Sequence, residues 1–303
     1  LELPKFTIKQ LMNSGVHFGH KTMRWNPKMS NFLYGSKSSI HIINLQKTAP
    51  LLYKALKVIA EVVSKNGRVL MVGTKRQASP LVAEYANRCG QYYINHRWLG
   101  GILTNWRTVS SSISLLGEYE RKLENKDNSL NKKELLVLER KYNKLTKSIG
   151  GIRNMGGRPD LLFIVDTNKE SLAVAEAHKL GIPIIGVVDS NSDPSLIDYP
   201  IPGNDDSARA IELYCQLVCD AALAGIKDEM MKSGANIGEN NSKKSKDVKK
   251  SAVNNNNADK STESSDNSAA DNNQQDASAN AIVEEISDIA DEQSGDKSGS
   301  AVN

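Results

Sequence analysis

Short apolar runs alternate with segments of helical periodicity along most of the chain. An unbroken apolar run is typical of a strand buried on both faces, and apolar residues three and four positions apart mark one face of a helix. This alternation predicts βα units around a parallel sheet, preceded by a short helix that Thr7 caps and Gly15 ends. The expected strands are Ile40–Asn44, Arg68–Gly73, Tyr92–Asn95, Leu161–Asp166 and Ile182–Asp189, and the expected helices are Pro50–Lys65, Ala78–Arg88, Lys169–Leu180 and Asp206–Ala224.

Two helical patterns, Asn105–Glu124 and Asn131–Lys147, interrupt the alternation with no strand between them. Each has an apolar stripe, so the two can pack together as an antiparallel coiled coil whose other faces carry Lys and Arg. We therefore expect a helical hairpin, inserted at about residues 105–149, that projects from the α/β body. Its seam is formed by Leu115, Leu116, Tyr119 and Leu123 on one side and by Leu135, Leu138, Tyr142 and Leu145 on the other.

The composition changes after Ile226. From there to Asn303 the chain has no Phe, Trp or Tyr, and Asn, Ser, Asp, Lys and Ala dominate. Such a segment cannot bury enough apolar surface to offset the conformational entropy lost on folding. We expect one α/β domain over residues 1–227 and a disordered low-complexity tail over residues 228–303.

Charge is strongly polarised along the chain, although the net charge is only +4. Residues 1–159 carry 27 basic and 9 acidic side chains, a net of +18, whereas residues 160–227 and 228–303 each carry a net of −7. A bound polyanion neutralises the repulsion among the basic side chains of this half. Its binding is also favoured because the polyanion releases condensed counterions. Nucleic acid is the expected partner, and a solvated lysine-rich face that only maintains solubility is the alternative.

The cysteines and the apolar runs bear on the compartment. Cys89, Cys215 and Cys219 form no CxxC pair, so neither a disulfide framework nor a zinc knuckle is expected, and a reducing compartment suits them. No stretch approaches the roughly 18 apolar residues of a membrane span, and the first ten residues do not resemble a signal peptide. We expect a cytoplasmic protein without a membrane partner.

Two segments combine cations with aromatic rings. The first is residues 16–29 (VHFGHKTMRWNPKM), and the second runs from Asn95 to Arg107. Lys and Arg neutralise phosphates while aromatic planes stack on exposed bases, which is how irregular RNA is recognised. Both segments are therefore candidate RNA contacts. The alternative is that Trp25, Trp98 and Trp106 anchor their loops onto the core.

A metal site is the next candidate. His17 and His20 could supply two ligands, with Asp189 or Asp205 as oxygen partners on loops at strand ends. Zinc and magnesium are the ions considered, although no cofactor is required. The alternative is that both imidazoles cap loop backbone or touch phosphate.

An α/β phosphate- or nucleotide-binding enzyme is the alternative function. Gly73-Thr74-Lys75 follows a strand and could cradle a phosphate, but the chain has neither GxxxxGK[ST] nor GxGxxG after a strand. Residues 189–193 begin like a calcium loop, yet Pro194 and Pro200 stand where that loop needs Gly and Glu. Neither a catalytic site nor a small-molecule substrate is expected.

Several blocks, in the same order, resemble one family. They include VHFGHKTMRWNPKM at 16–29, VGTKRQ at 72–77, RWLGGILTN at 97–105 and IPGNDD at 201–206. From about Phe6 to Ile226 the chain is similar to ribosomal protein two of the bacterial small subunit, in an alphaproteobacterial-like form. The resemblance implies a flavodoxin-like, Rossmann-like parallel sheet with helices on both faces and a protruding coiled-coil hairpin.

The same resemblance implies a structural role in translation, without enzymatic activity. The expected partners are small-subunit ribosomal RNA and neighbouring ribosomal proteins, including ribosomal protein one, on a bacterial cytoplasmic ribosome rather than an organellar one. The positions predicted to face the RNA are His17, Lys21, Arg24, Trp25, Lys28, Lys75, Arg76, Arg97, Trp98, Arg107, Lys132, Lys133, Arg140 and Lys144.

Overall fold

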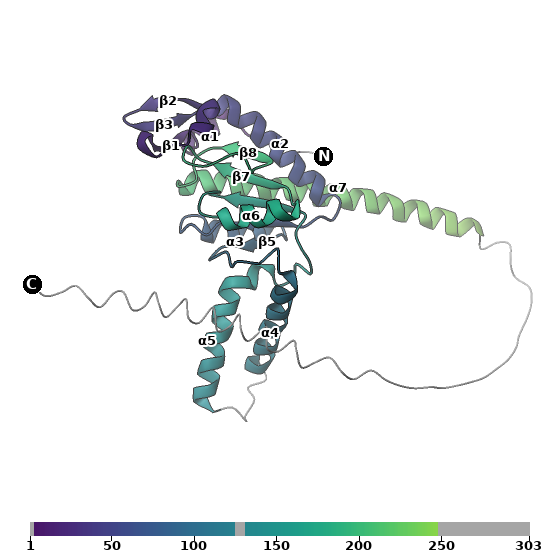
Figure 1. Ribbon diagram of the computed structural model, residues 1–303. Coiled ribbons are helices and arrows are strands. Elements are labelled where there is room, and N and C mark those ends of the chain that lie inside the picture. The colour runs from purple at the N-terminus through teal and green to yellow at the C-terminus, as the bar shows by residue number, and fades with distance from the viewer. Residues whose placement is uncertain (1–2, 125–130, 248–303) are drawn as a thin grey trace, which may run out of the picture.

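The computed structural model describes residues 3–124 and 131–247, and a five-stranded parallel sheet lies at its centre (Figure 1). The strand order is β5-β4-β6-β7-β8, which is the flavodoxin-like order, so the predicted fold class is confirmed. β4, β6 and β7 are buried along their whole length, which explains their unbroken apolar sequences. The strands are β4 (Val69–Val72), β5 (Tyr92–Ile94), β6 (Leu161–Val165), β7 (Ile184–Val188) and β8 (Tyr199–Pro202).

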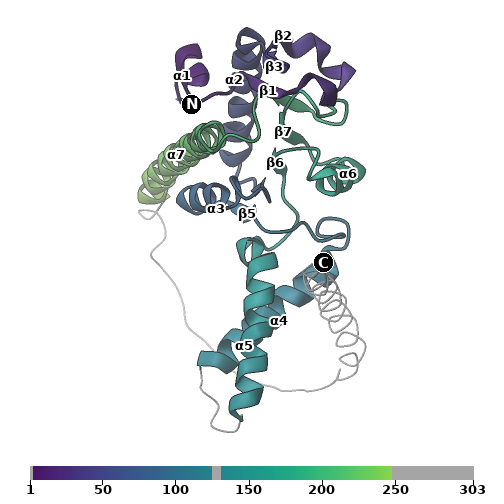
Figure 2. The same ribbon diagram turned by 90° about the vertical axis from the view of Figure 1, so that its left-hand side faces the viewer.

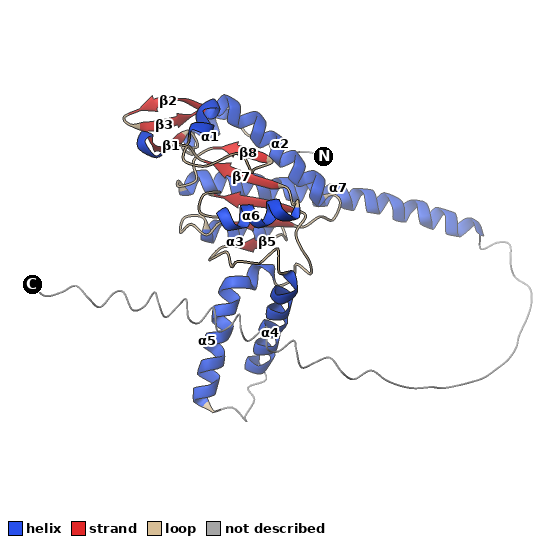
Figure 3. Cartoon of the chain, viewed as in Figure 1, coloured by secondary structure: helices blue, strands red, loops and turns tan. Residues whose placement is uncertain are grey.

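Helices cover both faces of the sheet, as the two views and the colouring by secondary structure show (Figures 2 and 3). Successive residues along β4, such as Met71 and Val72, face opposite sides of the sheet. One face packs against α2 (Leu45–Val63), α3 (Ser79–Arg88) and α7 (Ala208–Asp247). The other packs against α6 (Ser171–Leu180) and the base of the helical hairpin.

The N-terminal segment forms a separate small unit. Thr7 caps helix α1 (Ile8–Asn13), as its sequence predicts, and the structure shows that Thr7 and Gln10 form a capping box there. Next comes an antiparallel sheet of order β1-β3-β2, in which the segment between β1 and β2 forms two short 3-10 helices. The expected strand Ile40–Asn44 belongs to this N-terminal sheet and not to the parallel one, which corrects the prediction. Its elements are β1 (Phe18–Lys21), η1 (Thr22–Arg24), η2 (Pro27–Phe32), β2 (Leu33–Lys37) and β3 (Ile40–Ile43).

The predicted pair of insert helices is present as α4 (Trp106–Glu124) and α5 (Lys132–Ile149), followed by a turn of 3-10 helix, η3 (Gly150–Ile152). The two helices pack against each other and project away from the sheet (Figure 1). Their base is part of the core, because Leu116 and Leu145 are buried in the same cluster as strand β4. The hairpin is therefore anchored as well as self-packed.

Helix α7 is longer than expected. Its predicted end is Ala224, and the predicted tail begins at residue 228, yet the helix continues to Asp247. Residues 248–303, which hold most of the predicted tail, lie outside the described residues. No described helix is both long enough and apolar enough to span a membrane.

Replacing either of two helical glycines with alanine should change the thermal midpoint, but in opposite directions. A Cβ at Gly225 of α7 would lie 2.6 Å from the Ala60 carbonyl oxygen of α2, whereas a Cβ at Gly117 of α4 would meet nothing within 4 Å. Alanine is favoured over glycine in a helix by about 1 kcal/mol. We expect Gly117→Ala to raise the thermal midpoint and Gly225→Ala to lower it, because α7 must move off α2. A higher midpoint for Gly225→Ala would contradict this close packing.

Candidate functional site

Charged side chains from four loops meet at the carboxyl edge of the parallel sheet. Lys75 follows β4, and its Nζ lies 2.8 Å from a carboxylate oxygen of each of three aspartates. These are Asp166, after β6, and Asp205 and Asp206, after β8. Because parallel strands end at one edge, these distant residues converge there. We call the following group the charge cluster: His20, Lys75, Asp166, Asp189, Asp205 and Asp206.

The cluster is largely withdrawn from solvent. Asp205 is fully buried and Lys75 is 15% exposed. Burial lowers the pKa of Lys75, but the carboxylates around it outweigh this effect and raise the pKa, so the ammonium group stays charged. Burial, together with the neighbouring Asp189 and Asp166, raises the pKa of Asp205 to about 7. The cluster therefore concentrates negative charge that Lys75 only partly neutralises.

Asp166 has an unusual backbone conformation, with a φ of 68°. Its carboxylate accepts hydrogen bonds from the backbone N–H groups of Asn168 and Lys169, both at 3.1 Å, and it also contacts Lys75. These local bonds stabilise a left-handed conformation that aspartate adopts more readily than most residues. The chain turns sharply here, and the turn directs the carboxylate at Lys75.

His20 connects the N-terminal sheet to this edge. Its Nδ1 lies 3.0 Å from Asp189 Oδ2 and its Nε2 lies 3.2 Å from Asp206 Oδ2, while the hydrogen bond to Asp189 raises its pKa. The His20 backbone N–H donates to Ser190 Oγ at 2.8 Å. A Cβ at Gly19 would lie 2.8 Å from that Oγ, so the close approach of β1 requires glycine. The N-terminal sheet thus covers the edge where α/β enzymes bind ligands.

The candidate phosphate cradle is occupied by groups of the same chain. Thr74 donates to the buried Glu170 carboxylate from its backbone N–H, at 3.3 Å, and from its hydroxyl. Lys169 Nζ donates to the Thr74 carbonyl oxygen at 3.0 Å. The Lys75 ammonium group and the Thr74 N–H and hydroxyl are therefore all bonded to carboxylates of the same chain. The structure gives the enzyme alternative no support.

Glu176 of α6 organises the second basic and aromatic segment, and sequence analysis did not single it out. Its carboxylate accepts hydrogen bonds from the Trp98 indole at 3.0 Å, from the Gly101 and Leu103 N–H groups at 2.8 and 3.0 Å, and from the Thr104 N–H and hydroxyl at 3.1 Å. Trp98 is only 5% exposed. The geometry therefore supports the alternative in which Trp98 anchors its loop.

The predicted RNA-facing residues fall into distinct settings. Lys21, Arg24 and Trp25 are exposed, whereas Lys28 is exposed but bonded to Asp193 at 2.6 Å. His17 is half-buried, and its Nδ1 has no partner among the described residues. Figures 1 and 2 place the N-terminal sheet and the hairpin at opposite ends of the molecule. The remaining exposed cations are Arg76, Arg97, Arg107, Lys132, Lys133 and Arg140, and Lys144 is half-buried.

Of the candidate metal ligands, the structure brings together His20, Asp189 and Asp205, whose ligand atoms all lie within 4.8 Å of one another. His17 is not in this group. Sequence analysis also missed the acids that fix the edge, Asp166 and Asp206. The position of Asp166 directly after a buried strand is the one local signal that could have found it.

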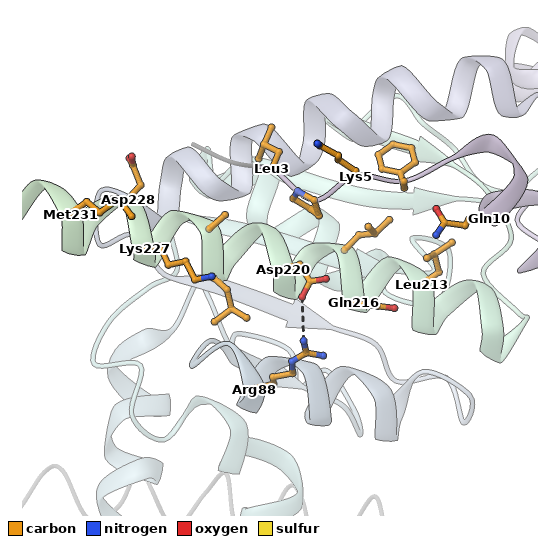
Figure 4. Close-up of a pocket in the computed structure, with 15 residues that line it drawn as sticks. Leu3, Lys5, Gln10, Arg88, Leu213, Gln216, Asp220, Lys227, Asp228 and Met231 are labelled. Carbon is orange, nitrogen blue, oxygen red and sulfur yellow. Dashed lines mark hydrogen bonds and ion pairs between the residues drawn. The ribbon is translucent and has the colours of Figure 1, made fainter.

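A groove lies elsewhere, between the N-terminal segment and helices α3 and α7 (Figure 4). Its volume is about 880 Å³, and an ion pair between Arg88 and Asp220 lies across it. Leu3 and Lys5 line one side and Leu213 and Lys227 the other. No residue of the charge cluster lines this groove, so the groove and the cluster are separate features.

The fold and the charge cluster at its carboxyl edge define the class of protein. It is a doubly wound α/β protein whose projecting helical hairpin presents cations to solvent. Residues 11–225 match the family model described as ribosomal protein S2. The chain is 59% identical to the small ribosomal subunit protein uS2 of Ehrlichia canis over 237 residues, covering 78% of this chain and 81% of the relative. It is 55% identical over 240 residues to the corresponding Chelativorans protein, covering 79% and 90%.

The chain belongs to the ribosomal protein S2 family. It is a structural constituent of the small ribosomal subunit and not an enzyme, it functions in translation, and its family needs no cofactor. Its partners are ribosomal RNA and ribosomal proteins. The resemblance found in the sequence is confirmed.

Glu176 gives a stability prediction. Burial raises its pKa, but hydrogen bonds from Trp98 and three backbone N–H groups outweigh burial and lower it. Its stabilising effect is therefore present above the unfolded pKa and is lost as the pH falls through the lower, folded value. We expect Glu176→Gln to lower the free energy of unfolding by about 1–3 kcal/mol at pH 7, because a Gln side chain cannot satisfy all these donors.

The measurement is urea unfolding at pH 7 and again at about pH 3, with the exposed Glu139→Gln as the control. Glu139→Gln should leave the midpoint unchanged. The loss for Glu176→Gln should shrink at the lower pH, where the wild-type carboxylate is increasingly protonated. An equal loss at both pH values would show that the effect is not due to the carboxylate charge.

Proposed function

We propose that the chain binds small-subunit ribosomal RNA through two separate cationic surfaces. The first, the loop surface, comprises Lys21, Arg24 and Trp25, with Lys28 beside them. The second, the hairpin surface, comprises Lys132, Lys133 and Arg140 on α5. The main observation for both is that cations project to solvent from elements that are packed on the core. Among the described residues, Lys21, Arg24 and the three hairpin cations have no carboxylate within ion-pair distance.

The loop surface is supported by the N-terminal sheet beneath it. Trp25 is 41% exposed, and its ring lies 5.4 Å from that of His41, so a face remains for stacking while the loop is held. The Asn26 N–H donates to the Ser190 carbonyl oxygen at 2.8 Å and fixes the loop to the sheet edge. A loop already ordered loses less conformational entropy on binding RNA.

Two residues of the predicted set take a positioning role in this proposal. Lys75 is held by three aspartates, and Trp98 is held by Glu176. Neither has its polar group available to RNA in this arrangement. Arg76 directly follows Lys75 and Arg97 directly precedes Trp98, and both are exposed, so the proposal assigns the RNA contacts of these segments to the arginines, together with Arg107.

The proposal extends to domains, partners and location. Residues 1–227 would form the ribosomal domain, consistent with a family match that ends at residue 225, and residues 228–303 an accessory extension. The resemblance to the bacterial family supports a cytoplasmic ribosome as the location, and ribosomal protein one as a neighbour docked by this chain. His17 is assigned a contact with ribosomal RNA beside the loop surface.

The loop surface predicts a change in salt dependence. Lys21→Ala combined with Arg24→Ala should weaken binding to small subunits that lack this protein. The plot of log affinity against log salt should also become shallower by about 1.5, because each lost phosphate contact removes about 0.7–0.9. The control is Lys57→Ala with Lys65→Ala, the same charge change at exposed sites outside both surfaces. An unchanged slope in the loop variant would contradict the proposal.

The hairpin surface predicts loss of incorporation without loss of stability. Glutamine has nearly the helix propensity of Lys and Arg, so replacing Lys132, Lys133 and Arg140 with Gln should preserve α5 and move the thermal midpoint by only a few degrees. Recovery of the variant in salt-washed small subunits should fall several-fold. Lys57→Gln with Lys65→Gln should incorporate normally. Normal recovery of the hairpin variant would remove this surface from the proposal.

A further inference from the structure

The groove in Figure 4 carries apolar side chains that the described part of the chain leaves partly uncovered. Leu3 and Phe6 of the N-terminal segment are half-buried, and so are Leu213 and Leu223 of α7. Met231, near one end of the groove, is 74% exposed. Apolar side chains gathered along one groove mark a place where another chain segment can bind.

The groove is long enough for a short helix. The residues that α7 contributes to it recur every three or four positions from Leu213 to Met231, so they form one stripe of that helix. At a rise of about 1.5 Å per residue this stripe is about 27 Å long, whereas a helix of ten residues is about 15 Å long. With a volume of about 880 Å³, the groove can receive one such helix alongside α7.

A segment of the same chain has the matching sequence pattern. Residues 248–303, which lie outside the described residues, contain no Leu, Met, Phe, Trp or Tyr, and all their isoleucines fall within residues 281–290, the tail segment. Ile282, Ile286 and Ile289 are four and three positions apart, so a helix would place them on one face. An isolated helix this short is marginal in water, so it needs an apolar surface to pack against.

The charges of the groove and of the tail segment are complementary. The segment contains Glu284, Glu285 and Asp288 and no Lys or Arg. Lys5 and Lys227 line the groove, are exposed, and have no carboxylate within ion-pair distance among the described residues. The two aspartates of the groove are each already paired with a cation of the fold. Two lysines are therefore left to attract an acidic segment.

The chain between α7 and the tail segment is long enough to return to the groove. Helix α7 continues from Met231 to Asp247, which carries the chain about 24 Å beyond the groove. The 33 residues from 248 to 280 follow, and a polar linker of that length spans about 30 Å on average. Because span and return path match, the effective concentration is about 1 mM, and a contact with a dissociation constant of roughly 0.1 mM would be about nine-tenths populated.

We propose that the tail segment binds in this groove as an amphipathic helix. Its isoleucine face packs on α7 and on the N-terminal segment, and its acids lie beside Lys5 and Lys227. The bound segment covers the apolar side chains of the groove and holds the N-terminal segment against α7. No residue of the loop surface or the hairpin surface lines the groove, so the inference does not rest on the proposed RNA binding.

The first experiment is carbodiimide crosslinking of the unaltered full chain, which joins a carboxylate to a lysine amine only where the two are in contact. Mass spectrometry should find Lys5 or Lys227 linked to an acid of the tail segment. In a mixture of isotopically light and heavy chains, these links should join residues of one chain. Links between light and heavy chains would place a second copy in the groove and overturn the proposal, and so would the absence of both links.

The second experiment is hydrogen–deuterium exchange of the full chain at short labelling times. Amides of the tail segment should exchange about tenfold more slowly than those of the polar residues before it, since the segment would be docked about nine-tenths of the time. Ile282→Ser, Ile286→Ser and Ile289→Ser together should abolish this protection. Val248→Ser with Val253→Ser, the matched control outside the segment, should preserve it. Equal exchange in the wild type and the isoleucine variant would contradict docking.

A charge reversal tests the orientation of the segment. Lys5→Glu with Lys227→Glu should speed exchange of the tail segment several-fold, and adding Glu284→Lys with Glu285→Lys should restore the protection. Protection that the lysine reversal leaves unchanged would overturn the placement of the acids beside these lysines.

The control for the charge reversal is Lys57→Glu with Lys65→Glu, at exposed sites that do not line the groove. It should leave exchange of the tail segment as in the wild type. Circular dichroism identifies any variant that fails to fold, and the crosslinks of the unaltered chain then decide.

Discussion

The ammonium group of Lys75, 2.8 Å from three aspartate carboxylates, is the interaction on which the carboxyl edge of the sheet depends. Charges withdrawn from water are costly, and removal of one partner leaves the others uncompensated at about 3–5 kcal/mol. The loops after β4, β6 and β8 are therefore fixed relative to one another. His20 extends the same network to β1, so the position of the N-terminal sheet follows from it.

This network also explains why a fold shared with many enzymes is here a scaffold. Doubly wound sheets bind ligands where the strand order reverses, which in this chain is between β4 and β6. Lys75 and the Thr74–Glu170 bonds fill that position, and β1 covers the edge beside it. The RNA surfaces proposed above accordingly lie away from this edge, on the N-terminal loop and the hairpin.

The sequence predicts those elements whose signal is local. Buried strands such as β6 are unbroken apolar runs, and Thr7 caps its helix through a bond to a residue three positions on. β8 was missed because its prolines argue against a strand, although an edge strand tolerates them. The charge cluster joins residues up to 186 positions apart, as in the contact between His20 and Asp206, and no local pattern contains that information. Glu176 in its helix gives no signal at all.

The folded structure accounts for the charge polarity of the sequence. Residues 160–227 carry a net of −7, and several of their acids point inward: Asp166, Glu170, Asp189 and Asp205 are buried. Of these, Asp166 and Glu170 satisfy backbone donors or cations of the body, as the half-buried Glu176 also does. The basic residues of 1–159 are mostly exposed, with Lys75 as the internal exception. The buried acids therefore fix loops from within the fold, and the exposed surface of residues 1–159 is more positive than the net charge of +4 suggests.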